Sequence, residues 1–422
     1  MTLDQVSWPA AWQTVPLWSL FQRVKDVGHP NEQMLSVYRD HGVIEKESRD
    51  DNFNKTAQNR NIYQLVDQGW LILNRMKAWQ GSVGVSTFRG IVSGHYICFQ
   101  PRHGNDPRFL NHLLRSPIYT AEMRRLSRGV RPSQFEIDND LLRVLPIHLP
   151  PLTEQKAIAD YLDAETARID ALITKKRRMI DLLTQRWLGE LLATTAAPSE
   201  QTTGVNPWQL ATDGVEGGFV PLRRLVEKSW GGDWGAEPGQ SVRDLPCVRS
   251  ADFEFRDLVA TTGAIRSFDH PTLRTRLLAP GDLVVEKSGG GEGVPVGRVV
   301  GWRGGDAVPT NFAGALRPAS GVNSDFLLLV LRAAYELGLP WLSIKQTTGL
   351  QNLDFGHYMS HSVPAPPEST QRALATRLMA SLSESRDLQS KIHKQLDLLT
   401  ERRQALITAA VTGELEIPGV AA

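Results

Sequence analysis

The segment from Gly281 to Ser288 is the part of this sequence that comes nearest to a catalytic motif. Its pattern, Gly281-x4-Glu286-Lys287-Ser288, is one glycine short of the Walker A loop that holds nucleotide phosphates. The missing glycine is one whose backbone lines the phosphate, and Glu286 would repel the anion, so we reject a nucleotide-hydrolysing site. Two interpretations stay open: a flexible hairpin turn, or a loop whose free backbone N–H groups and Lys287 approach a DNA phosphate.

The other catalytic patterns are weaker. His357 and His361 have the i, i+4 spacing of two metal ligands, but no glutamate stands beside them and no third ligand is evident. We therefore expect a structural or surface pair and no metal site. Asp282 and Glu286 lack the distinctive spacing of a nuclease, and no G-x-S-x-G motif occurs. The chain is expected to bind a partner rather than to catalyse a reaction.

Basic residues gather in one part of the chain and indicate what that partner is. Residues 75–131 contain ten Lys and Arg against two acids, interleaved with His, Tyr and Gln, a composition that suits phosphate contact and base recognition. Residues 287–349 are less basic, with six against four. The candidate DNA-contacting residues are Arg75, Lys77, Arg89, Arg128, Arg131 and Gln134, followed by Lys287, Ser288, Arg298, Arg303, Lys345 and Gln346.

The bulk composition sets wider limits. A length of 422 residues with 41% hydrophobic residues predicts two or three domains, and a net charge of +1 names no partner. Cys98 and Cys247 stand far apart, so neither a disulfide framework nor a zinc site is expected. Neither a signal peptide nor a membrane-spanning stretch is evident, so we expect a cytoplasmic protein.

An internal repeat organises the chain. Residues 150–191 and 366–407 align without a gap and share 14 identities in 42 positions. Weaker matches lie upstream, for example Val-Pro-Leu at 15–17 and at 220–222, with offsets that drift as loops lengthen or shorten. The chain is therefore predicted to be a tandem duplication of a variable module followed by a constant helix.

The constant segments are predicted to be two long amphipathic helices. Apolar residues recur every three or four positions over 154–193 and in the second copy, with Thr153 and Ser369 as expected N-caps and Gly413 as the end. A narrow apolar stripe on a helix about 60 Å long needs another long helix, so we expect an antiparallel coiled coil. The expected packing residues are Ile158, Leu162, Ile169, Leu183, Leu374, Leu378, Leu388, Ile392 and Leu399.

The predicted fold class is α+β, with two similar mixed α/β domains separated by the helices and related by an internal pseudo-twofold duplication. Strands are predicted at 70–73, 83–88, 283–286 and 296–302, and helices at 108–126 and 324–337. The expected domains are 1–149 (first recognition domain), 150–197 (central helix), 198–365 (linker and second recognition domain) and 366–422 (C-terminal helix and tail).

Four segments carry a resemblance to a known family. Residues 145–163, which begin Leu-Pro-Ile-His-Leu-Pro-Pro-Leu-Thr-Glu-Gln, and residues 406–413, Leu-Ile-Thr-Ala-Ala-Val-Thr-Gly, resemble the specificity subunit of type I restriction-modification systems. Residues 69–78 and 93–96 do so too. The resemblance covers essentially the whole chain. The second copy departs from the pattern at 365–371, where the Glu-Gln pair is absent, and this is expected to affect how a partner docks.

The resemblance implies a non-catalytic DNA-binding subunit. Each recognition domain would recognise one half of a bipartite double-stranded DNA target, and the helices would set the spacer, so that four residues inserted into the central helix should lengthen it. The implied partners are modification (methyltransferase) subunits and restriction (motor-nuclease) subunits, which would carry S-adenosylmethionine, ATP and Mg, with no cofactor in this chain. The alternatives are a coiled-coil scaffold whose terminal domains bind proteins, and a self-sufficient nuclease or methyltransferase.

Overall fold

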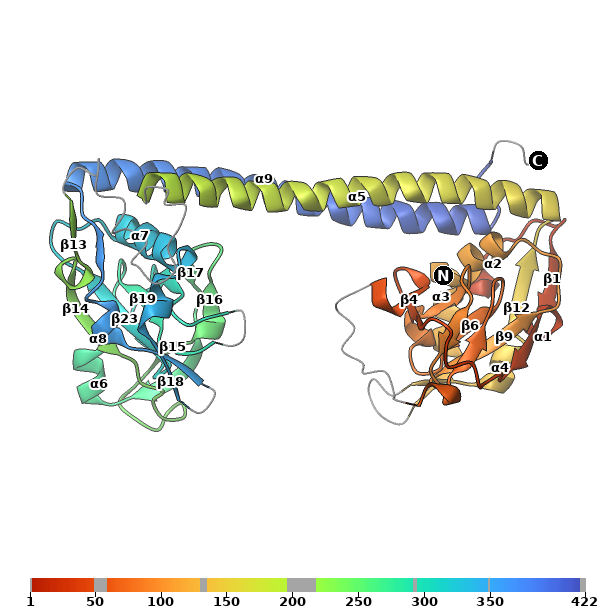
Figure 1. The fold of residues 1–422 in the computed structure, drawn as a ribbon, viewed down its shortest axis with the longest axis horizontal. Coiled ribbons are helices and arrows are strands. Elements are labelled where there is room, and N and C mark those ends of the chain that lie inside the picture. Colours follow the sequence, from red (N-terminus) through yellow and green to blue (C-terminus); the bar gives the residue numbers. More distant parts are fainter. Residues whose placement is uncertain are drawn as a thin grey trace. The chain divides into compact units, whose positions relative to one another are not determined.

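The computed structural model describes residues 2–48, 59–129, 135–195, 218–290, 294–347 and 350–417. The chain folds as two compact units (Figure 1). Unit 1 is Met1–Arg177 with His393–Ala422, and unit 2 is Arg178–Ile392. Two long helices, α5 (Leu152–Thr195) and α9 (Glu368–Val411), each contribute one part to either unit. No helix among the described residues is long and apolar enough to cross a membrane.

Unit 1 is a mixed α/β domain. Its strands are β1 (Gln13–Pro16), β2 (Phe21–Val24), β3 (Leu35–Tyr38), β4 (Gly42–Glu45), β5 (Gln64–Val66), β6 (Leu71–Asn74), β7 (Val83–Val85), β8 (Gly90–Val92), β9 (Tyr96–Pro101), β10 (Ser127–Arg128), β11 (Glu136–Ile137) and β12 (Pro146–Leu149). Its helices, besides the long pair, are α1 (Leu17–Leu20), α2 (Pro107–Arg115), α3 (Pro117–Arg125) and α4 (Asn139–Arg143), with a short 3-10 helix η4 (Ala78–Gln80).

Unit 2 is built in the same way. Its strands are β13 (Phe219–Pro221), β14 (Val226–Gly231), β15 (Arg243–Val248), β16 (Phe253–Glu254), β17 (Val259–Ala260), β18 (Ala264–Phe268), β19 (Leu283–Glu286), β20 (Ser288–Gly289), β21 (Val299–Gly301), β22 (Val308–Pro309), β23 (Ala313–Pro318), β24 (Ile344–Thr347), β25 (Leu350–Leu353) and β26 (Ser362–Pro364). Its shorter helices are α6 (His270–Thr275), α7 (Ser324–Glu336) and α8 (Phe355–Tyr358).

Strand pairing repeats from one unit to the other. The central sheet has the order β2-β9-β6-β7 in unit 1, and the first four strands in unit 2 are β14-β23-β19-β21. In both units the first strand pairs antiparallel with the last, as β1 with β12 and β13 with β26. A small hairpin also recurs, as β10–β11 and β24–β25. The repeated topology confirms the predicted duplication and the α+β fold class.

The sequence-predicted elements mostly stand where expected. The strands predicted at 70–73 and 283–286 are β6 and β19, whose apolar residues are buried in the sheet centre. The single helix predicted over 108–126 is wrong, because the structure has two helices there, α2 and α3. Ser116 ends α2 and caps α3 by accepting from Tyr119 N, and Pro117 occupies the first turn of α3. The helix predicted over 324–337 is α7.

The long helices pack antiparallel within each unit. In unit 2, Glu190 accepts a hydrogen bond from Ser381 at 2.7 Å, and Trp187 Nε1 donates to the Leu378 carbonyl at 3.2 Å. In unit 1, Arg403 pairs with Asp170 at 2.9 Å. Both helices begin directly after a proline pair, two residues earlier than expected, so Thr153 and Ser369 lie inside their helices and not at N-caps.

Most of the residues expected to pack along the seam, the line of contact between α5 and α9, are at least partly buried. Ile158, Leu162, Ile169, Leu378 and Ile392 are buried, and Leu183, Leu374 and Leu399 are half-buried. Leu388 is wrong, because its side chain is 47% exposed. The heptad position on that turn belongs to Gln389, which bonds Thr184 across the seam at 3.1 Å.

Each domain is fixed to its helix by an equivalent glutamine. Gln155, at the start of α5, accepts from the backbone N–H of Asp106 at 3.0 Å and donates to the Pro150 carbonyl at 2.8 Å. Gln371, at the start of α9, accepts from Asn323 N at 3.0 Å and donates to the Pro366 carbonyl at 2.8 Å. Asp106 and Asn323 are the N-caps of α2 and α7, so the same lock joins a domain helix to a long helix in both units.

Apolar contacts complete each attachment. In unit 1, residues of α2 and α3 form one cluster with the start of α5 and the end of α9, and in unit 2 α7 does so with the other halves. Figure 1 shows α2 beside the helix pair in unit 1 and α7 beside it in unit 2. In unit 1, α4 lies at the end remote from the helices (Figure 1). The surface near α4 is therefore not used to dock the long helices.

Candidate nucleic-acid interface

The two small hairpins place the candidate basic residues at equivalent positions. In unit 1, Arg128 on β10 lies opposite Glu136 on β11. In unit 2, Lys345 on β24 lies opposite Asn352 on β25. We call the surface formed around each hairpin the hairpin face. It consists of Arg75, Arg128, Glu136 and Asp138 in unit 1, and of Lys287, Lys345, Asn352 and Asp354 in unit 2.

A shared backbone contact brings the residue after the central strand to this face. Ile137 N on β11 donates to the carbonyl of Arg75 at 3.2 Å. Leu353 N on β25 donates to the carbonyl of Lys287 at 2.8 Å. Arg75 and Lys287 both follow a buried strand, β6 and β19 respectively, so the two basic residues are structural equivalents.

Each hairpin face also has a basic residue paired with a helix-capping aspartate. Arg128 Nε lies 3.8 Å from Asp138, and Lys345 Nζ lies 2.5 Å from Asp354. Asp138 caps α4 by accepting from Asp140 N and Leu141 N, and Asp354 caps α8 by accepting from His357 N. The bond from Lys345, and next the one from the His357 backbone, hold the pKa of Asp354 below its usual value. Arg128 is 74% exposed and Lys345 73%, so both cations can reach solvent or a ligand.

Aromatic rings lie beside both faces. In unit 1, Trp79 on η4 contacts Phe135 edge-on with ring centres 5.3 Å apart, and the Arg124 guanidinium lies 5.8 Å from the Trp79 ring. In unit 2, Lys287 Nζ lies 5.8 Å from the ring of Phe355. Lys287 pairs with no carboxylate among the described residues. Cations next to flat aromatic surfaces suit contact with both phosphates and bases.

Backbone contacts test whether the N–H groups of the Walker-like segment, residues 281–288, are free to approach a phosphate. The N–H groups of Lys287 and Ser288 both donate to the Phe312 carbonyl, at 2.8 and 3.0 Å. The expectation of free backbone N–H groups at these two residues is therefore wrong. Glu286 is buried and forms a two-point ion pair with Arg298, with both N–O distances 2.8 Å. Arg298 thus neutralises the buried carboxylate, and this pairing raises the pKa of the guanidinium.

Of the other candidate residues, Arg89 and Arg303 are paired elsewhere, whereas Lys77 and Ser288 lie next to a hairpin face. Arg89 pairs with Glu32 and Asp67 at 2.9 and 2.6 Å. Arg303 pairs with Asp325 in the first turn of α7. Lys77 is exposed at the start of η4, near the face, and Ser288 Oγ donates to Asn352. Arg131 and Gln134 lie outside the described residues, as does the side chain of Gln346, whose backbone belongs to β24.

A second basic surface in unit 1 was not predicted. Arg23, Arg102 and Arg143 line a cavity of about 310 Å³, the Arg143 guanidinium lies 6.0 Å from the Trp18 ring, and the Trp18 side chain is half exposed. The other lining residues are Leu17, Phe21, Gln22, Phe99, Asn139 and Asp140. Its residues come from α1, β2, β9 with the residue after it, and α4, segments far apart in the chain, so no local pattern could have indicated it. It lies beside α4, which directly follows the hairpin.

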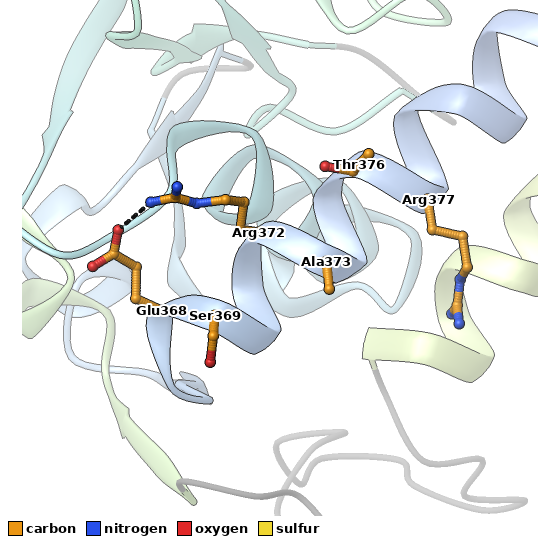
Figure 2. Close-up of a pocket in the computed structure, with 6 residues that line it drawn as sticks. All are labelled: Glu368, Ser369, Arg372, Ala373, Thr376 and Arg377. Carbon is orange, nitrogen blue, oxygen red and sulfur yellow. Dashed lines mark hydrogen bonds and ion pairs between the residues drawn. The ribbon is translucent and has the colours of Figure 1, made fainter.

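A groove along the first turns of α9 has a different character (Figure 2). Glu368 and Arg372 form an ion pair at 2.7 Å within the helix, and Arg377 Nη2 donates to Thr194 Oγ1 of α5 at 2.9 Å. Ser369, Ala373 and Thr376 complete the lining. Both arginines face carboxylates, Arg372 that of Glu368 and Arg377 that of Glu190 at 3.8 Å, so the groove is not suited to a polyanion.

The histidine pair and the cysteines are structural. His357 Nδ1 and His361 Nε2 both bond Ser343 Oγ, at 2.9 and 2.8 Å, which accounts for their spacing. Burial raises the pKa of the Cys98 and Cys247 thiols to about 12, so both stay protonated and unreactive. Within the described ranges, no three His, Cys, Asp or Glu side chains converge as metal ligands would.

Comparison with known proteins finds a matching family model and a relative similar over most of the chain. Residues 9–181 match the family model described as the type I restriction modification DNA specificity domain. The chain is 20% identical over 430 residues to the type I restriction enzyme StySPI specificity subunit of Salmonella potsdam, covering 96% of this chain and 90% of that protein.

Solved structures share the fold. A chain from work on complex assembly and conformational transition of the type I R-M system matches with a TM-score of 0.70 and 17% identity, over 97% of this chain and all (100%) of that one. The HsdS subunit from Thermoanaerobacter tengcongensis matches with a TM-score of 0.52 and 18% identity, over 98% of this chain and 100% of that one. These likenesses extend over both units and both long helices.

Proposed function

We propose, from the premise that this chain belongs to the family of type I restriction-modification specificity subunits, that unit 1 and unit 2 each recognise one half of a bipartite DNA target. The observation that carries the proposal is the repeated hairpin face. Both units present a basic residue after the central strand and another on the hairpin, at equivalent backbone positions. Basic and polar side chains of these faces would contact phosphates, which orient the duplex, and base edges, which specify its sequence.

The long helices are assigned the role of setting the spacer between the half-sites. The support is that α5 and α9 pack antiparallel in each unit and that each domain is locked to one of them by Gln155 or Gln371. A domain locked to a helix cannot slide along it, so the length of the helices fixes where that domain meets DNA.

The chemistry is assigned to partner subunits. Modification subunits would bind S-adenosylmethionine and methylate the target, and restriction subunits would use ATP and Mg, while this chain supplies recognition alone. The balanced groove at the start of α9 (Figure 2) suits a protein partner better than DNA, because Glu368 and Arg372 already neutralise one another.

Methylome sequencing of cells with and without this gene tests the proposal. We expect one modified motif made of two short defined sequences separated by an undefined gap, and we expect it to vanish when the gene is deleted. In parallel, the complex with modification subunits should bind duplexes carrying this motif, and binding should weaken steeply as salt rises. A motif that is unchanged by the deletion, or one without a gap, would contradict the proposal.

A further inference from the structure

We propose that Arg75 and Glu136 together determine one base pair of the target, a G·C pair in the half-site recognised by unit 1. This inference rests on the proposed function and adds to it the residues and the chemistry of one recognition contact. It starts from the one feature in which the two hairpin faces differ most. At equivalent positions, unit 1 has an arginine and a glutamate, whereas unit 2 has Lys287 and Asn352.

The backbone holds Arg75 in a fixed place. Its N–H donates to the His95 carbonyl at 2.9 Å, and its carbonyl accepts from Ile137 N at 3.2 Å. The residue is thus bonded on one side to the loop before β9 and on the other to the hairpin. A side chain that starts from a rigid backbone loses less freedom when it binds, which favours a directional contact.

The side chain of Arg75 is also held in place, and its terminal N–H groups remain available to donate hydrogen bonds. Arg75 Nε lies 2.7 Å from Glu136 Oε1, and the two side chains are 40% and 48% exposed. Within the described part of the chain, no other side chain bonds the terminal Nη1 and Nη2 groups of Arg75. Two parallel N–H donors match the O6 and N7 acceptors of guanine in the major groove.

The carboxylate argues for a base rather than a phosphate as the ligand. A phosphate approaching Arg75 would meet the exposed negative charge of Glu136, whereas the edge of a base carries no net charge. Glu136 can also accept a hydrogen bond from the amino group of cytosine. An adjacent guanidinium and carboxylate therefore complement the two edges of a G·C pair.

Unit 2 provides an internal comparison. Asn352 Oδ1 accepts from Ser288 Oγ at 2.5 Å, and Lys287 presents a single ammonium in place of the planar fork of an arginine. The same backbone position therefore offers different hydrogen-bonding groups, so changes at residues 75 and 136 should affect one half-site only.

The test measures base preference in the full chain assembled with its modification subunits. Duplexes carrying the motif with one half-site randomised are selected for binding and sequenced, for each half-site in turn. The variants are Arg75→Lys, which keeps the charge and loses the fork, and Glu136→Gln, which removes the carboxylate. Arg108→Lys is the matched control, because Arg108 on α2 is a similarly exposed arginine (41%) that pairs with Asp160 and Asp163 of α5, on the side of unit 1 that docks the long helices.

We expect Arg75→Lys to lower the preference for G·C by at least about fivefold at a single position of one half-site. Glu136→Gln should weaken the preference at the same position or its neighbour, and Arg108→Lys should leave the profile as in the parent. A uniform loss across all positions would identify a phosphate contact and overturn the proposal, as would an unchanged profile or an effect in the other half-site. A parent complex with no two-part preference would instead show that the proposed function itself fails.

Discussion

At the scale of single residues, the protonation of His148 is tied to folding. Its ring stacks on Trp8 with centres 3.8 Å apart, and its Nδ1 lies 3.3 Å from the hydroxyl of Tyr119. Burial lowers its pKa from 6.5 to about 4, so the folded unit holds the neutral ring. As the pH falls below 6.5, the unfolded chain takes up the proton before the folded one does, and stability is lost down to about pH 4.

The variant His148→Phe is expected to remove this pH dependence, because phenylalanine can keep the stack and carries no proton. The melting temperature of the parent should fall relative to that of the variant as the pH is lowered from 7 to 4, by a few degrees. Thermal unfolding followed by tryptophan fluorescence measures the difference. A difference that stays constant over this range would show that His148 is protonated equally in both states.

The sequence identified the basic half of the hairpin face and missed the acidic half. Arg75, Arg128, Lys287 and Lys345 were predicted from charge and position after a strand. Glu136, the partner of Arg75, lies 61 residues further along the chain, and its place depends on how β10 and β11 pair. Contacts of this kind follow from tertiary structure, which no local pattern specifies.

Among the elements, the long helices differ in where they require glycine: the position after the end of α9 requires it, and the interior of α5 does not. Gly413, which follows α9, has a φ of +75°, and a Cβ there would lie 2.5 Å from Pro9 Cγ. At Gly189, inside α5, a Cβ would meet nothing within 4 Å apart from the backbone of its own helix turn. One glycine is thus needed for the fold and the other is not.

We expect Gly413→Ala to destabilise unit 1 by about 1–2 kcal/mol or more, through the left-handed backbone and the contact with Pro9. Gly189→Ala is the matched substitution and should stabilise unit 2 by about 0.5–1 kcal/mol, because alanine suits a helix interior. Denaturant unfolding gives both free energies. Equal effects from the two substitutions would mean that the turn after α9 is not held as the structure has it.

The regular elements were the most predictable part of the fold. Period and length sufficed for α5, α9, β6 and β19, because buried strands and long amphipathic helices have strong local patterns. Detail within the seam was harder. Polar residues such as Gln389 occupy heptad positions, so a search for apolar spacing selected the exposed Leu388 instead.

For the whole molecule, the proposed ruler predicts that helix length controls the spacer. Because α5 and α9 pack antiparallel, an insertion in one must be matched in the other, so the insertion into the central helix alone that was expected from the sequence is replaced here by a paired insertion. We propose one heptad after Arg177 and one after Ile392, where the two units meet along the chain. Seven residues add about 10 Å, which corresponds to about three base pairs.

The methylome of cells carrying this double insertion should show the same two half-sites with a gap longer by about three base pairs. Binding should be weaker than in the parent, because the added base pairs also rotate one half-site around the duplex. The insertion in α5 alone is the control and should reduce binding without defining a new gap, since the helices no longer match. An unchanged gap in the double insertion would refute the ruler.

The pairing of β1 with β12 and of β13 with β26 has a consequence for inheritance. The chain leaves for each domain and returns from it through neighbouring antiparallel strands, next to the glutamine that locks the domain in place. The segment between the paired strands therefore folds as one insert between the long helices. An in-frame recombination event that exchanges the DNA encoding one such segment would leave the sequences of α5 and α9 and their pairing unchanged. A lineage could then acquire a new half-target in a single step.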